Sequence, residues 1–111
     1  MLKKIILLLF FLVTAQSYSQ LPDFNFDATS TNETCAGNGT IDMVVSNTSP
    51  GSEIVYQLYL APDFLNAIAE TTSDSFGSLQ SGSYRIVATQ SLDGQVNSQQ
   101  EDLVIEDLVV D

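Results

Sequence analysis

Apolar and polar residues alternate with a period of two along much of this chain, and this pattern constrains its fold more than any other feature. Residues 54–60 are the clearest case, because Ile54, Tyr56, Leu58 and Leu60 all fall on one side. Successive side chains of a strand point to opposite faces of a sheet, so these four are predicted to face a core. Shorter runs at 24–27, 41–46, 84–89 and 103–105 predict further strands.

Turn-forming residues separate these runs. They lie at residues 37–39, 49–51, 61–63, 81–82 and 93–94, and each group contains glycine or proline. Short strands between such turns predict an all-β fold, an immunoglobulin-like antiparallel β-sandwich of about seven strands. Residues 63–70 also fit two helical turns, but we favour a loop through Asn66 followed by a strand over residues 67–72.

The N-terminus has the three parts of a secretory signal peptide. Lys3 and Lys4 precede an apolar run at residues 5–13, and small residues follow at 14–19. A membrane-spanning helix needs about 20 apolar residues, more than this run supplies. Cleavage fits after Ser17 or Ser19, and we favour the second. We therefore expect a signal peptide at 1–19, a single β-sandwich domain at 20–111, and a secreted or outer cell-surface location.

Charge narrows the range of partners. Cleavage would remove both lysines and leave Arg85 against fourteen carboxylates, a formal charge of −13. Such a surface repels nucleic acid and anionic lipid, so we expect neither as a partner, nor membrane insertion after cleavage. It would attract cations or basic protein surfaces. The simpler interpretation, which we favour, is that the charge keeps the protein soluble.

The residues for common catalytic chemistry are missing. The chain has no histidine, and after cleavage no lysine, which removes the usual general base and Schiff-base amine. A carboxylate pair of the kind used by glycosidases remains, but so small a domain rarely holds a deep cleft, and we expect no enzyme. Cys35 is the only cysteine, so an internal disulfide is excluded. We expect its thiol to be buried, with an intermolecular bridge as the alternative.

The acidic residues are candidate ligands for calcium, which is the only cofactor that the sequence suggests. Calcium binds carboxylate and carbonyl oxygens. The candidate ligands are two neighbouring pairs near the C-terminus and two acids in turns: Glu101, Asp102, Glu106, Asp107, Asp63 and Asp93. None of these spacings is diagnostic, and a solvated acidic face is the favoured interpretation.

Two aromatic residues are candidate ligand contacts. Tyr59 points outward if Tyr56 points inward, and Phe64 falls in a predicted loop. Exposed aromatic rings bind sugars or protein partners. The alternative for Phe64 is that it covers the end of the sandwich.

Two stretches resemble a known family. Residues 34–41 (Thr-Cys-Ala-Gly-Asn-Gly-Thr-Ile) resemble the Cys-x-Gly-x-Gly-x-Ile opening of extracellular repeat modules in surface proteins of gliding Bacteroidota. Residues 76–87 resemble the Phe-x-x-Leu-x-x-Gly-x-Tyr-x-Val closing strand of these adhesin-type modules. The resemblance covers about residues 28 to 106. It implies an immunoglobulin-like unit on the cell surface that serves adhesion or spacing. The second cysteine and the C-terminal sorting domain are absent, so the chain is either a fragment or a stand-alone relative.

Tyr84 and Gly82 are predicted to have a structural role. In Greek-key sandwiches a tyrosine near the start of a late strand donates a hydrogen bond back to the preceding turn, and Tyr84 has this position. The favoured function is a non-catalytic adhesin-type or spacer module that contacts a protein or glycan. The alternatives are a stand-alone secreted sugar- or peptide-binding protein and, least favoured, a small carboxylate-dependent hydrolase.

Overall fold

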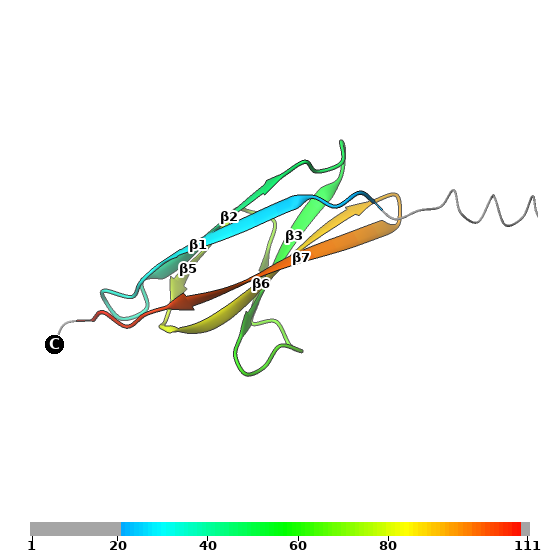
Figure 1. The fold of residues 1–111 in the computed structure, drawn as a ribbon. Coiled ribbons are helices and arrows are strands. Elements are labelled where there is room, and N and C mark those ends of the chain that lie inside the picture. Colours follow the sequence, from blue (N-terminus) through cyan, green and yellow to red (C-terminus); the bar gives the residue numbers. More distant parts are fainter. Residues whose placement is uncertain (1–20, 110–111) are drawn as a thin grey trace, which may run out of the picture.

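Every regular element in the computed structural model, which describes residues 21–109, is a β-strand. The strands are β1 (Asn25–Thr31), β2 (Gly39–Ser46), β3 (Glu53–Leu60), β4 (Ala69–Thr71), β5 (Ser75–Leu79), β6 (Gly82–Leu92) and β7 (Gln95–Ile105). They form two antiparallel sheets, with the orders β1-β2-β5 and β4-β3-β6-β7 (Figure 1). The predicted all-β sandwich is confirmed. The predicted signal peptide lies outside the described residues.

The short strand β4 joins the same sheet as β3. Gln57 faces Glu70 in this antiparallel pairing, and the Ile68 amide donates to the Leu58 carbonyl just before β4 begins. In the constant-type immunoglobulin fold the fourth strand instead joins the sheet of the first two. The chain therefore folds as a two-sheet β-sandwich with its fourth strand on the larger sheet.

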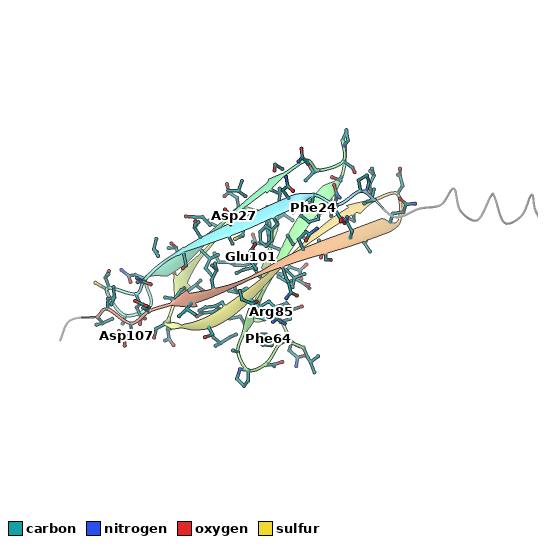
Figure 2. The ribbon with its side chains drawn as sticks, in the orientation of Figure 1. Phe24, Asp27, Phe64, Arg85, Glu101 and Asp107 are labelled. Atoms are coloured by element: carbon teal, nitrogen blue, oxygen red, sulfur yellow. The ribbon has the colours of Figure 1, made fainter. Side chains whose placement is uncertain are left out.

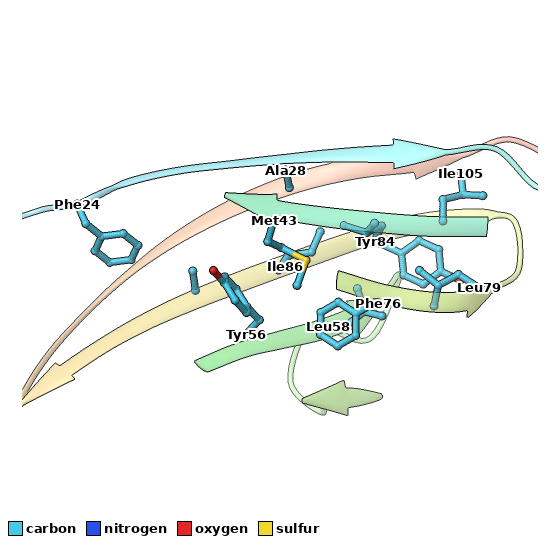
Figure 3. Close-up of a cluster of buried hydrophobic side chains, with 12 residues drawn as sticks. Phe24, Ala28, Met43, Tyr56, Leu58, Phe76, Leu79, Tyr84, Ile86 and Ile105 are labelled. Carbon is cyan, nitrogen blue, oxygen red and sulfur yellow. The ribbon is translucent and has the colours of Figure 1, made fainter. Parts of the chain in front are cut away.

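The core lies between the two sheets (Figure 3). Strand β6 has the longest series of buried side chains at every second position. Tyr84, Ile86 and Ala88 are all buried there, as predicted. The other buried apolar side chains are Phe24, Ala28, Ile41, Met43, Tyr56, Leu58, Phe76, Leu79 and Ile105. The prediction for Leu60 was wrong, because this residue ends β3 at the edge of the core and remains partly exposed.

The turn between β6 and β7 matches its sequence signal. Asp93 and Gly94 both have positive φ angles, 52° and 79°. Two consecutive positive values define the tight hairpin turn whose twist suits antiparallel strands, and Asp-Gly is a preferred sequence for it. The turn sets the register of the long β6–β7 ladder, in which Leu92 faces Gln95.

The chain enters and leaves the sandwich at opposite ends (Figure 1). Strands β1 and β7 run in the same direction, because Glu33 and Asp107 form a parallel bridge just beyond them. The Ser30 hydroxyl also donates to the Val104 carbonyl at 3.3 Å. We call the end near residue 21 the entry pole and the end near residue 109 the exit pole. In Figure 2 Phe24 and Asp107 lie toward these two poles.

Candidate functional site

The connection between β3 and β4 projects from the sandwich (Figure 1). We call residues 61–68 the contact loop. Its two ends are held by the backbone, since the Ala61 amide donates to the Ser83 carbonyl at 2.9 Å and the Ile68 amide to the Leu58 carbonyl at 2.7 Å. Both acceptors lie in strands of the larger sheet. The loop is thus fixed at its base.

Asp63 organises the interior of the contact loop. One of its carboxylate oxygens accepts hydrogen bonds from the amides of Leu65 and Asn66, at 3.0 and 3.1 Å. These bonds favour the charged form, so the pKa of the Asp63 carboxyl is lowered, first by the Leu65 amide and then by that of Asn66. An aspartate side chain that caps its own turn in this way is a common device in loops.

Arg85 attaches the loop to the outer face of the larger sheet. Its Nε and Nη2 atoms donate to the two carboxylate oxygens of Asp102, at 2.8 and 3.1 Å. The hydrogen bond from Arg85 lowers the pKa of the Asp102 carboxyl. The guanidinium carbon lies 4.1 Å from the centre of the Phe64 ring (Figure 2). This cation–π contact holds the loop against the sheet.

Three apolar side chains of the contact loop are exposed to solvent. Leu65 is 91% exposed, Ile68 is 54% exposed and Phe64 is 40% exposed. Three large apolar side chains within five residues of one loop are therefore exposed, and exposed apolar patches are typical of contact surfaces. Phe64 was predicted from the sequence as a contact residue, whereas Leu65 and Ile68 were not. The available signal was the presence of apolar residues in a segment that begins with Pro62 and Asp63.

Tyr59, the second aromatic candidate, lies close to the first. It faces Arg85 across the β3–β6 ladder and is half-buried. Its hydroxyl donates to the Gln57 side-chain oxygen at 3.3 Å. The structure therefore places both Tyr59 and Phe64 beside Arg85, on the outer face of the larger sheet.

The calcium candidates are not gathered in one place. Glu101 and Asp102 are neighbours in β7, so their side chains point to opposite faces, and Asp102 is paired with Arg85. Asp107 accepts a hydrogen bond from the Val109 amide at 3.0 Å. Glu106 lies at the exit pole, where its carbonyl accepts from the Glu33 amide. Between residues 21 and 109 no three acidic or cysteine side chains lie close enough together to hold a metal ion.

The predicted burial of Cys35 was wrong, because its side chain is exposed. It lies in the connection between β1 and β2, beyond the alternating pattern of either strand. Asn38 folds this connection by accepting hydrogen bonds from the amides of Thr34 and Cys35, at 2.9 and 3.0 Å. The resulting turn keeps residue 35 outside the sandwich.

Two side-chain amides, one buried and one half-buried, tie down the chain at the entry pole. The Gln90 side chain is 0% exposed, and its Nε2 atom donates to the Asn97 side-chain oxygen at 3.0 Å. Asn97 in turn donates to the carbonyls of Leu21 and Pro22, at 3.2 and 2.9 Å. Gln90 also accepts from the Ser52 hydroxyl at 3.0 Å. We call Gln90 and Asn97 the entry clamp.

A buried carboxylate ties down the chain at the exit pole. The side chain of Glu33 accepts hydrogen bonds from the amides of Gly37 and Ser81, at 2.6 and 3.4 Å. Its backbone is also paired, because the Glu33 amide donates to the Glu106 carbonyl at 2.9 Å and its carbonyl accepts from the Leu108 amide at 2.7 Å. We call Glu33 the exit clamp.

Tyr84 reinforces the exit pole in the way that its position predicted. Its hydroxyl donates to the Gln80 carbonyl at 2.8 Å, so the predicted hydrogen bond to the preceding turn is present. Burial raises the pKa of the Tyr84 phenol, and the nearby charge of Glu33 raises it further. Gly82 is needed for close packing, because a β-carbon there would lie 3.0 Å from the Leu60 side chain.

Comparison of the chain with models of known families, with curated proteins and with solved structures found no match. The surface of residues 21–109 has no detectable pocket. Over the same residues no helix is long and apolar enough to cross a membrane.

Proposed function

We propose that this chain is a secreted or cell-surface module of the adhesin type, which spaces neighbouring parts or presents contacts to a protein or glycan without catalysing a reaction. The observation that supports this proposal is the path of the chain between two clamped poles. Leu21 and Pro22 are held by the entry clamp, and Leu108 is held by the backbone of Glu33. A unit with this geometry transmits tension from one end to the other.

The direction of the strands makes this geometry resistant to force. Tension pulls the start of β1 toward the entry pole and the end of β7 toward the exit pole. Because the two strands are parallel and adjacent, their contacts are loaded together, in shear. These contacts are the Ser30–Val104 hydrogen bond and the backbone pairing of Glu33 with Glu106 and Leu108.

Single-molecule stretching of the chain by its two ends tests this proposal. The test variant is Ser30→Ala, which removes the donor of the Ser30–Val104 hydrogen bond between the two loaded strands. The control is Met43→Ala, which removes buried apolar contacts elsewhere at a cost of about 2–5 kcal/mol. Since forced unfolding is governed by the unfolding rate, the Ser30 variant should unfold at lower force than the control after correction for thermal stability. Equal unfolding forces would contradict a load-bearing role.

A stand-alone sugar- or peptide-binding protein is the second candidate. The observation that favours it is the position of Tyr59 and of the partly exposed Phe64 beside Arg85. Because the chain has no tryptophan, tyrosine fluorescence reports on this surface. Titration with a panel of neutral sugars should change the signal of the native chain and of Tyr56→Phe, but not that of Tyr59→Phe. An unchanged native signal would remove the sugar-binding candidate.

A further inference from the structure

The contact loop exposes apolar side chains and is braced by its own hydrogen bonds. We propose that Phe64, Leu65 and Ile68 dock into an apolar surface of a protein partner that is rimmed by basic side chains. This inference rests on the proposed function, because it names the kind of partner that the presented loop contacts. It is supported by how the loop is held and by the charge around it.

Contacts within the protein set the shape of the contact loop in the absence of a partner. The Asp63 carboxylate fixes the turn through the amides of Leu65 and Asn66. Phe64 covers the Arg85 guanidinium, which is itself held by Asp102. These contacts leave Leu65 in water. Because these contacts hold the loop in one shape, docking to it loses less conformational entropy, which favours affinity.

Charge indicates what the partner carries around its apolar surface. Asp63 lies in the loop itself, and Glu70 is exposed in β4 directly after it. Arg85 is the only cation from residue 20 onward, and it is paired with Asp102 and covered by Phe64. The loop therefore presents apolar side chains in a negative field, and basic residues on a partner complement it.

The negative charge of the protein also argues against other partners for the contact loop. A second copy of the chain from Gln20 onward would bring two molecules of formal charge −13 together, and like charges facing each other cost several kcal/mol across an interface. Anionic lipid and nucleic acid are repelled for the same reason. The exposed apolar side chains of the contact loop and the negative charge around them both favour a basic protein surface as the partner.

Titration of the chain from Gln20 onward, followed by amide NMR shifts, tests the proposal. The probes are two synthetic amphipathic helical peptides of equal length, one of leucine and lysine and the other of leucine and glutamate. We expect the lysine peptide to shift amides within residues 61–70 and the glutamate peptide to cause no shift. Leu65→Ser should weaken binding of the lysine peptide roughly tenfold, because it removes one buried leucine side chain from the interface.

The control variant is Val44→Ser, which removes an apolar side chain that is 65% exposed on the smaller sheet. It should bind the lysine peptide as the native chain does. Shifts spread over the whole acidic surface, or equal affinities for Leu65→Ser and the native chain, would overturn the proposal. So would Leu65-dependent binding to phosphatidylcholine vesicles without binding to the peptide, since this would assign the loop to a lipid surface. None of these results depends on the stretching experiment, so the two proposals fail separately.

Discussion

At Gly39 a single added carbon atom would clash with neighbouring strands. A β-carbon there would lie 2.7 Å from the Leu79 carbonyl oxygen and 3.0 Å from the Ile105 Cγ2 atom. Leu79 O belongs to the backbone of a neighbouring strand and cannot turn away. The glycine is thus needed for the close approach of β2, β5 and the end of β7.

We expect Gly39→Ala to lower the free energy of unfolding by about 1–3 kcal/mol, the usual cost of overpacking. The control is Gly77→Ala, because nothing lies within 4 Å of a β-carbon at Gly77. That variant should stay within about 0.5 kcal/mol of the native chain. Urea unfolding of the three proteins measures both values. Equal stabilities of the two variants would show that β2 and β5 do not approach as described.

The ion pair between Arg85 and Asp102 has a pH signature. The folded pKa of the Asp102 carboxyl is lowered from its usual value of 3.8 by the hydrogen bond from Arg85. A lowered pKa stabilises the fold fully above the unfolded value, and this contribution is lost as pH falls through the folded value. Because the pair is on the surface, solvent screens it and its contribution to stability is small.

We therefore expect Asp102→Asn to be less stable than the native chain near neutral pH, and the gap should close below about pH 4. Thermal unfolding from pH 2 to pH 7 measures the difference. The control is Glu70→Gln, which removes the same charge from the same sheet. A gap that is unchanged at low pH, or equal for the two variants, would contradict the role given to this pair.

Some functional residues could be predicted from the sequence and others could not. The bond from Tyr84 was predictable because it depends on a local spacing of a few residues. The entry clamp was not, because Asn97 contacts Leu21 and Pro22 from more than seventy positions away. The exposure of Cys35 also depends on a turn, not on the alternating pattern. Local chemistry is visible in the sequence, whereas long-range polar contacts are not.

At the scale of elements, alternation predicted strands well where each strand is regular. The alternating pattern did not identify β5. Ser78 in this strand has a positive φ of 56°, and as a result Phe76 and Leu79 are both buried although they are three residues apart. The pattern also predicted only residues 103–105 of β7. The first part of that strand carries Asn97 and other polar residues on its inner side, and it pairs with β6 through backbone hydrogen bonds and the side-chain bonds Gln90–Asn97 and Thr89–Ser98. Such pairing leaves no apolar pattern in the sequence.

The entry clamp should stabilise one element locally. We expect Asn97→Ala to free residues 21–24, because the variant loses the hydrogen bonds from Asn97 to the carbonyls of Leu21 and Pro22. Hydrogen exchange measured by mass spectrometry should rise at this segment and at the start of β1, while β3 remains protected. Ser98→Ala, at the next position of the strand, is the control. Unchanged exchange near residue 21 would show that the clamp does not hold the chain.

For the whole molecule the main electrostatic feature is its excess of negative charge. The chain from Gln20 onward carries one arginine against fourteen carboxylates, a formal charge of −13, whose self-repulsion destabilises the compact state and is screened by salt. We expect the unfolding midpoint of the chain from Gln20 onward to rise with sodium chloride. We also expect calcium at matched ionic strength to give no further rise, since the four C-terminal candidates are not gathered. A calcium-specific rise would contradict this and would direct attention to Glu106 and Asp107.

The proposed function requires the chain to work outside the cytoplasm. The exposed thiol of Cys35 offers a direct test, because it is the only cysteine and a reagent can reach it in the folded protein. The measurement is labelling of intact producing cells and their medium with a membrane-impermeant maleimide, with Cys35→Ser as the control. We predict that the native chain is labelled on intact cells or in the medium and that the variant is not. Labelling only after the cell envelope has been opened would contradict a secreted or surface module.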